Sequence, residues 1–300
     1  MNKLNLSIIV VSYNTKKITL NCLKSIIKSL KNSSLKYEII VVDNGSKDKS
    51  VLAIKKLKSK IKNQNLNFSI IENKTNIGFG KANNQAVKIA NSDYLLFLNS
   101  DIIVLNSAIE KLYNFYKQNE KMINFLGGKL LNKDQSPQPS CGPNYSLPMI
   151  FAHLFLRGDY WGFTRYSPNK IKEVDWISGA CILTKKESFN QIGGFDEKIF
   201  MYMDEVDLLY RAKKNNLRVF FYPKAEFIHL GSASSGQRTY PILQVYQGLT
   251  YFYKKNFSSL SYFILKIMLK LKAVVSILIG KVINNQYLIK TYEKALALVR

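Results

Sequence analysis

The stretch DYLLFLNSD (93–101) joins a continuous apolar run to a polar end. An apolar run without alternation is typical of a strand that is buried on both faces of a parallel sheet. Asn99, Ser100 and Asp101 then follow the carboxyl end of that strand, which is where ligands bind in open parallel sheets. Asp101 is well placed to hold a divalent cation that also bridges a diphosphate. A solvated turn or helix cap is the alternative, because Asn, Ser and Asp also serve those roles.

The residues before this stretch alternate between short strands and helices. The predicted strands are LSIIVVSYN (6–14), YEIIVVDNGSKD (37–48) and FSIIEN (68–73), and helices are predicted at about 18–30, 49–62 and 80–90. Strand and helix in alternation at these intervals predict βαβ crossovers. The sequence therefore indicates an α/β fold with a mainly parallel central sheet flanked by helices.

Polar clusters end each of these strands, and together they predict one ligand site. The clusters are Ser12-Tyr13-Asn14, Asp43-Asn44-Gly45-Ser46, Asn76-Ile77-Gly78 and Asn99-Ser100-Asp101. Asp43 is a candidate acceptor for a nucleotide base or ribose hydroxyls. Gly78 and Gly80 allow a close backbone approach to a phosphate, and Lys81 adds a positive charge. No third glycine completes the G-x-G-x-x-G spacing, which disfavours a dinucleotide-binding dehydrogenase.

The second half of the chain adds a long irregular segment and further elements. Residues 132–172 carry five prolines and predict a loop of the kind that serves as a lid or binds an acceptor. A strand with a following helix is expected at 174–188, and a strand pair ending in a flexible turn at 219–236. His229, at the expected end of a strand, is a candidate to complete a metal shell, although a lone His is more often structural. His153 has no assigned role.

An acidic cluster, Asp204-Glu205-Val206-Asp207, precedes Arg211. On a helix, Asp204, Asp207 and Arg211 share one stripe while Glu205 lies about 100° round. Adjacent carboxylates in different surroundings can have separated pKa values, so that one serves as a base while another is structural. The alternative is a solvated acidic helix start, which the helix dipole favours.

Composition limits the function classes. The 300 residues carry a formal net charge of +24, which favours an anionic partner, but only six of the 44 basic residues are Arg. The three cysteines are far apart and odd in number, which disfavours a disulfide framework or zinc cluster and is typical of a reduced cytosolic protein. The first apolar run has no cleavage site and is interpreted as a strand rather than a signal peptide.

The last part of the chain changes character. Residues 261–283 are apolar but are interrupted by four lysines, and the longest uncharged stretch, 273–280, is too short to span a bilayer. A basic amphipathic helix lying in a membrane interface is one interpretation, and a helix packed on the domain is the other. We therefore expect a catalytic domain at 1–256 and a basic amphipathic helical tail at 257–300.

Taken together, these features resemble the family 2 glycosyltransferases of the GT-A (nucleotide-diphospho-sugar transferase) fold, especially the bacterial rhamnosyltransferase-like branch. The resemblance runs from about 6 to 235. Its motifs are SIIVVSYN, VVDNGSKDKS, NIGFGKANNQAV, YLLFLNSD, WISGACILTKKESFNQIGGFDE and FMYMDEVDLLYR. Six motifs in order are far more specific than any one of them.

The resemblance implies a role for each matching position. The segment Ser12, Tyr13 and Asn14 together with Asp43 would hold the base and ribose, and Asp101 with His229 would hold Mg²⁺ or Mn²⁺. Along the donor and at its junction with the acceptor would lie Asn76, Gly78, Lys81, Asn83, Asn99, Ser100, Trp176, Ser178 and Gly179. Two positions depart from the family pattern. Asn99 replaces the first carboxylate of the D-x-D element, as in many members of this branch, and Asp204-Glu205 replaces the usual Glu-Asp, which makes Glu205 the expected base and Asp204 the alternative.

The implied reaction is an inverting sugar transfer to a hydroxyl of a cell-surface glycan or a polyprenyl-linked acceptor. The resemblance favours dTDP-rhamnose as donor, with a UDP-sugar second. The basic amphipathic tail and the net charge predict a cytoplasmic enzyme at the inner face of the cell membrane, where the tail would bind anionic lipid. Two other functions stay open. One is an inactive, membrane-associated scaffold of the same fold, and the other is a basic nucleic-acid binder, for which no recognition module is present.

Overall fold

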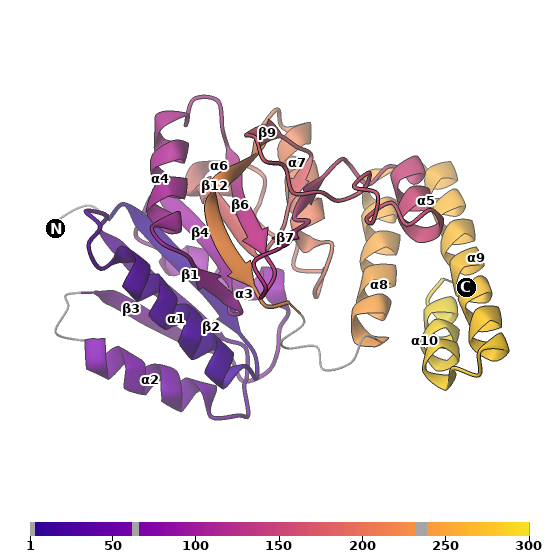
Figure 1. The fold of residues 1–300 in the computed structure, drawn as a ribbon, viewed down its shortest axis with the longest axis horizontal. Coiled ribbons are helices and arrows are strands. Elements are labelled where there is room, and N and C mark those ends of the chain that lie inside the picture. Colours follow the sequence, from indigo (N-terminus) through magenta and orange to yellow (C-terminus); the bar gives the residue numbers. More distant parts are fainter. Residues whose placement is uncertain (1–3, 62–65, 232–238, 300) are drawn as a thin grey trace.

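The centre of the molecule is a mixed sheet with helices on both faces, and three C-terminal helices lie to one side of it (Figure 1). The structure is a computed structural model that describes residues 4–61, 66–231 and 239–299. Within these residues the strand order of the main sheet is β3-β2-β1-β4-β11-β6-β12-β5.

The N-terminal part confirms the predicted strand–helix alternation. Its elements are β1 (Leu6–Ser12), α1 (Lys16–Leu30), β2 (Tyr37–Asp43), α2 (Ser50–Ile61), β3 (Asn67–Glu72), α3 (Phe79–Ile89) and β4 (Tyr94–Asn99). The four strands are all parallel, and Ser12 pairs with Asp43 while Val11 pairs with Asn99. This register brings the polar strand ends to the same edge of the sheet.

The second half completes the sheet with both antiparallel and parallel strands. Its elements are β5 (Ile102–Val104), α4 (Ala108–Gln118), β6 (Phe125–Leu131), β7 (Pro137–Gln138), β8 (Cys141–Gly142), α5 (Leu147–Phe155), β9 (Lys172–Glu173), β10 (Trp176–Ile177), β11 (Cys181–Lys185), α6 (Lys186–Gln191), α7 (Asp204–Lys214) and β12 (Val219–His229). Strand β11 runs antiparallel to β4 and β6, while β12 is parallel to β6. The short strands β8 and β10 form a separate pair.

The core consists of two apolar clusters, one on each face of the sheet. Successive residues of β1 point to opposite clusters: Ile8 and Val10 belong to one, and Ile9 belongs to the other. All three are fully buried, and burying a side chain of this size stabilises the fold by about 1.5–3 kcal/mol. Burial on both faces explains why these strands are continuous apolar runs.

Two predicted segments differ from the structure. The region 132–172 is not irregular throughout, because it contains β7, β8 and the helix α5, whose first turn accommodates Pro148. The expected strand pair at 219–236 is wrong: Val219–His229 is one strand whose register shifts between Tyr222 and Glu226, around a proline that lacks the N–H needed for regular pairing. The predicted flexible turn falls largely at 232–238, outside the described residues.

The C-terminal helices are α8 (Thr239–Asn256), α9 (Ser259–Val282) and α10 (Gln286–Ala297). Helix α9 packs against α8, α10 and α5, and its buried side includes Leu265, Leu269 and Ala273. Within the described ranges, no helix is both long enough and apolar enough to span a membrane. The expected division at 256/257 falls between α8 and α9, although α8 already belongs to the same group of helices (Figure 1).

Candidate active site

A cavity of about 340 Å³ lies at the edge where the polar strand ends meet. Its walls come from the loops after β1, β2, β3 and β4, from the segment around Trp176, from the start of α7 and from α8. The polar and aromatic lining residues, together with Gly179, are Tyr13, Thr15, Asn44, Asn76, Phe79, Asn99, Ser100, Asp101, Tyr145, His153, Arg165, Trp176, Ser178, Gly179, Tyr202, Asp204, Glu205 and His229. The structure thus brings together in one cavity ten of the predicted site residues together with Ser178.

A larger hollow of about 900 Å³ lies between α1 and α2. Aliphatic and Lys side chains dominate it, and its described lining residues include no carboxylate, imidazole or thiol. The smaller cavity carries all the groups suited to catalysis or cation binding, so we assign the candidate site to it.

Asp101 and His229 converge on one wall of the cavity. The Asp101 Oδ1 atom lies 3.3 Å from His229 Nε2, and the Nδ2 atom of Asn99 lies 3.4 Å from the same ring nitrogen. On the far side of the ring, Nδ1 lies 2.7 Å from Gln138 Oε1. If Nδ1 carries the proton, it donates to Gln138 and leaves Nε2 free to act as an acceptor. The pairing of β12 with β5 places His229 opposite Ile102, beside Asp101.

This pair fits a divalent cation that takes most of its ligands from elsewhere. Within the described ranges there is no cluster of three or more His, Cys, Asp or Glu side chains suited to a metal. Mg²⁺ usually keeps several waters and binds through one or two carboxylates together with substrate phosphates. One buried carboxylate with an adjacent imidazole at a cavity wall meets that requirement.

Asp204 and Glu205, at the start of α7, also line the cavity. The two residues before them, Tyr202 and Met203, have positive φ angles of 62° and 66°. This backbone conformation is strained for residues with side chains, and such strain gathers at functional sites. Gly179 packs against Glu205, because an added Cβ at Gly179 would lie in ordinary van der Waals contact, 3.5 Å from Cβ of Glu205.

The two carboxyls differ in their surroundings. Asp204 is only 4% exposed, and its Oδ2 atom has no hydrogen-bond partner among the described residues. Burial, and then the charge of Glu205, raise the pKa of Asp204 well above its ordinary value. Burial also raises the pKa of Glu205, but hydrogen bonds to its carboxylate, and after them the positive charge of Arg165, oppose this rise. Asp204 therefore retains a proton more readily than Glu205 does.

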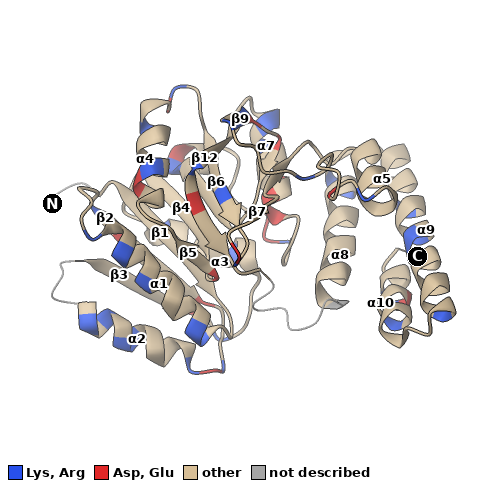
Figure 2. Ribbon diagram, in the orientation of Figure 1, with Lys and Arg blue, Asp and Glu red and all other residues tan. Residues whose placement is uncertain are grey.

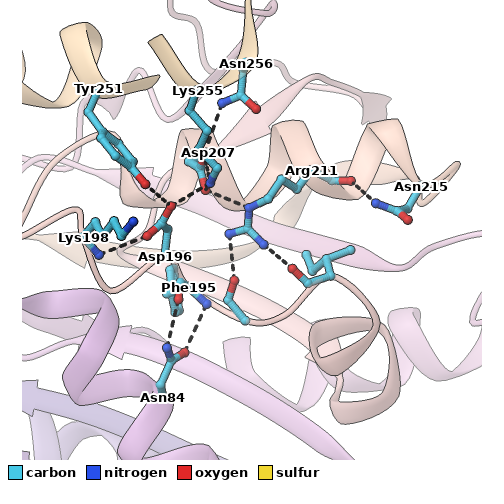
Figure 3. Close-up of polar contacts among 12 residues, drawn as sticks. Asn84, Phe195, Asp196, Lys198, Asp207, Arg211, Asn215, Tyr251, Lys255 and Asn256 are labelled. Atoms are coloured by element: carbon cyan, nitrogen blue, oxygen red, sulfur yellow. Dashed lines mark hydrogen bonds and ion pairs between the residues drawn. The ribbon is translucent and has the colours of Figure 1, made fainter. Parts of the chain in front are cut away.

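The rest of the acidic cluster has a structural role, shown in Figure 3. Asp207 is fully buried and accepts bonds from Arg211 Nε at 2.7 Å and from Lys255 Nζ at 2.8 Å. Lys255 also contacts Asp196 at 2.7 Å, and Arg211 donates to the carbonyl oxygen of Gly194 at 2.7 Å. This network ties α7 to α8 and to the loop before α7. It fixes the helix whose first residues face the cavity.

Amide side chains fix the loops after β2 and β3. Asn44 Nδ2 donates to Asn76 Oδ1 at 2.9 Å and to the carbonyl oxygen of Gly78 at 3.1 Å. Asn73 Nδ2 donates in turn to Asn44 Oδ1 and to Gln85 Oε1. Because these amides satisfy each other, the cavity wall around Asn44 and Asn76 is held in one shape.

The structure does not bring every predicted residue into the cavity lining. The predicted residues outside it are Ser12, Asn14, Asp43, Gly78, Lys81 and Asn83. Lys81 is exposed and lies 3.6 Å from Glu197. The Nδ2 atom of Asn83 donates to the carbonyl oxygen of Phe79. Asp43 accepts from the Ser46 amide through Oδ1, while its buried Oδ2 has no partner among the described residues and remains available to a donor group.

Arg165 is a lining residue that the sequence reasoning missed. It is the only Arg or Lys among the described residues that line the cavity, and its guanidinium carbon lies 5.4 Å from the ring centroid of Trp176. Its Nε atom is buried without a hydrogen-bond partner in the described part of the chain. The sequence offered only one indication of this role, which is that two of its six Arg residues lie in the proline-rich segment 132–172.

The remaining positive charge is spread over the molecule. Figure 2 shows Lys and Arg along α1, α2, α4 and α9, at opposite ends of the fold. The three cysteines are buried free thiols. The basic residues shown do not gather into a single stripe, which limits what the net charge says about partners.

Comparison with known proteins gives the family. The family described as "Glycosyl transferase family 2" matches residues 7–193. The N-acetylglucosaminyl-diphospho-decaprenol L-rhamnosyltransferase of Mycobacterium tuberculosis is 28% identical over 197 residues, which cover 59% of this chain and 64% of that protein. The rhamnosyltransferase WbbL of Escherichia coli K12 is 28% identical over 162 residues, which cover 51% of this chain and 60% of that protein.

Solved structures give the fold. The mannosyltransferase PcManGT from Pyrobaculum calidifontis, in complex with GDP-Man and Mn²⁺, aligns with a TM-score of 0.59 at 14% identity, covering 98% of this chain and 74% of that one. This likeness, with the sheet and helices described above, shows the GT-A fold that the sequence motifs predicted. The chain spans just under two thirds of the length of the curated rhamnosyltransferases it matches, and its family match covers more than half of its own residues. The chain belongs to glycosyl transferase family 2.

Proposed function

We propose that this protein is an inverting glycosyltransferase that moves a sugar, rhamnose in the first instance, from a nucleotide-diphosphate donor to an acceptor hydroxyl. One observation carries the proposal: in a family 2 chain, the carboxyl pair at 204–205 and the pair Asp101 and His229 line the same cavity. An inverting transfer needs a base on the acceptor side and charge stabilisation on the leaving-group side.

The leaving-group side is the wall formed by Asp101 and His229. These two side chains would hold a divalent cation, Mg²⁺ or Mn²⁺, with Gln138 fixing the imidazole. When bound there, the cation supplies positive charge to the departing nucleoside diphosphate. Tyr13 and Asn76 line the same cavity. Asp43 lies outside the cavity lining, and its buried Oδ2, which has no partner among the described residues, supports the proposal that it accepts from a group of the nucleotide.

The acceptor side is the wall around Glu205. We propose that Glu205 takes the proton from the acceptor hydroxyl, because the charge of Arg165 favours its ionised form. Asp204, whose pKa is raised further by burial and by Glu205, stays protonated and supports its neighbour. Since a general base contributes about 10²–10⁴-fold in rate, Glu205→Gln should lower turnover by that order.

The donor and acceptor follow from the relatives. Both relatives above are named as rhamnosyltransferases, which favours dTDP-rhamnose over a UDP-sugar, and the name of the mycobacterial relative includes a diphospho-decaprenol acceptor. We therefore propose a polyprenyl-linked or cell-surface glycan acceptor. Such a lipid-linked acceptor places the enzyme at the inner face of the cell membrane.

The surface of α9 supports that location. Its outward residues recur at helical spacing and include Phe263, Ile267, Leu271 and Leu278, all 49–60% exposed. The helix carries four lysines and no acidic residue, which suits an anionic lipid surface. We propose that the tail at 257–300 binds the membrane through this side, while its other side packs on α5 and α8.

Release of nucleoside diphosphate from a panel of nucleotide sugars, with and without Mg²⁺ or Mn²⁺, tests the activity and identifies the donor. Glu205→Gln and Asp204→Asn test the base, with Glu197→Gln on the surface as the matched control. Near-normal turnover in Glu205→Gln with none in Asp204→Asn would assign the base to Asp204. Binding of a donor without turnover under any condition would instead support the inactive scaffold, which the altered order of Asp204 and Glu205 motivates.

A further inference from the structure

The segment that follows α5 forms a tight turn with exposed aromatic side chains. Tyr160 is 77% exposed, Trp161 65% and Phe163 66%, and the preceding Leu156 is 58% exposed. Backbone hydrogen bonds close the turn, among them Tyr160 N to Arg157 O at 2.9 Å and Phe163 N to Gly158 O at 2.9 Å. The aromatic groups are therefore held outward by a defined backbone.

The underside of the same turn is polar and faces the protein. The Asp159 carboxylate lies 3.1 Å from His153 Nδ1 and accepts a hydrogen bond from the Thr164 hydroxyl. Burial opposes ionisation, but these hydrogen bonds lower the pKa of Asp159 below its ordinary value. The one acidic group of the turn is thus paired within the protein, although its side chain is 37% exposed. His153 and Arg165, at the two ends of this segment, both line the candidate active site.

The turn is connected to α9 through α5. Helix α5, which leads into the turn, lies beside α9 (Figure 1) and packs against it. Lys272 Nζ of α9 lies 5.9 Å from the ring centroid of Phe155 at the end of α5. Phe151 of α5 is itself 44% exposed. Exposed apolar groups thus occur on three neighbouring segments: the turn, α5 and α9.

We propose that the turn at 156–163, which we call the aromatic turn, enters the interface of an anionic phospholipid bilayer next to α9. Trp and Tyr favour this zone because their rings are apolar and their N–H or O–H groups remain hydrated. The lysines of α9 and the exposed Arg157 complement anionic headgroups. Residues at the base of the turn line the cavity, so its insertion would bring the cavity close to a lipid-linked acceptor. The inference rests on the membrane contact in the proposed function.

Tryptophan fluorescence tests this directly, because the chain has only two Trp residues and Trp176 is buried at 2% exposure. The full-length protein is mixed with vesicles of phosphatidylcholine and phosphatidylglycerol, with and without brominated acyl chains, and sedimentation reports binding. We expect a blue shift and quenching by brominated lipid that are absent in Trp161→Phe. Trp161→Ser should weaken vesicle binding about tenfold or more, given the apolar area that one indole buries.

Leu52→Ser is the matched control, because Leu52 is 53% exposed on α2, far from α9 in Figure 1. Its vesicle affinity should equal that of the wild type. Vesicle binding without any change in Trp161 emission would overturn the proposal that the aromatic turn enters the bilayer. The proposed membrane contact of α9 would not be affected. A blue shift that increases with protein concentration in the absence of lipid would also overturn this proposal. It would indicate that the aromatic turn binds a second copy of the chain. No vesicle binding at all would overturn both membrane contacts, while release of nucleoside diphosphate tests the proposed catalysis separately.

Discussion

Asp207→Asn perturbs the buried network that holds α7. Asp207 is 0% exposed and faces two cations, Arg211 at 2.7 Å and Lys255 at 2.8 and 3.0 Å. Each attraction at these distances amounts to about 6 kcal/mol at an effective dielectric constant of about 20, before the cost of desolvation is subtracted. Removing one partner of a buried ion pair costs about 3–5 kcal/mol, because the mostly buried Arg211 is then left without a carboxylate partner in the described part of the chain, although Lys255 keeps Asp196. We expect that loss in the free energy of unfolding.

Urea unfolding followed by circular dichroism measures this loss. With a slope of about 3 kcal/mol per molar urea, the midpoint should fall by about 1–1.7 M. Glu173→Gln is the matched control, because Glu173 pairs with Arg218 at 2.6 Å but both side chains are about 40% or more exposed. Exposed pairs contribute at most about 1 kcal/mol. Equal midpoint shifts in the two variants would refute the argument that burial makes the Asp207 network structural.

Three further predictions follow from the site. Asp204→Asn should raise the stability at neutral pH. The pKa of Asp204 is raised in the folded state, so Asp204 lowers the free energy of unfolding increasingly as the pH rises above its unfolded-state pKa of about 3.9. Thermal melts at pH 4 and 7.5 should therefore show a higher melting temperature for the variant only at pH 7.5. Arg165→Met and Arg165→Lys should both bind the donor or acceptor more weakly than the wild type, because Lys lacks the planar guanidinium group that lies over Trp176. Isothermal titration calorimetry measures these affinities. Gly78→Ala should destabilise the fold by about 1–3 kcal/mol in urea titrations, because the residue has a φ of +91° and a Cβ would lie 2.7 Å from the carbonyl oxygen of Phe200.

The N-terminal half of the fold could be predicted because its signals are local. Continuous apolar runs, helical spacing and polar strand ends each occupy about ten residues. The rule that parallel strands present their carboxyl ends at one edge then places Tyr13, Asn76 and Asp101 in the same region without knowledge of the packing. The register of Val11 with Asn99 confirms the step from those local patterns to a shared edge.

The other half of the site depends on packing between distant segments. Arg165 reaches the cavity only because its segment folds against Trp176, and no periodicity in 132–172 indicates that contact. Helix α8 supplies Val245 and Leu249 to the cavity wall, although in the sequence they form part of an ordinary amphipathic pattern. The different environments of Asp204 and Asp207 depend likewise on what α7 packs against.

The buried network and the strained start of α7 form one arrangement. The Oδ2 atom of Asp204 is buried with no hydrogen-bond partner in the described part of the chain, and Tyr202 and Met203 both have positive φ angles. Each feature lowers stability, so the start of α7 would relax if the rest of the helix were free. The bonds from Asp207 to Arg211 and Lys255 hold the second turn of the helix in place and thereby prevent that relaxation. The strained backbone at 202–204 therefore favours a change in the start of α7, while the ion pairs of Asp207, about one helical turn away, hold the helix in place. This is the physical reason to expect that weakening the network also displaces Glu205.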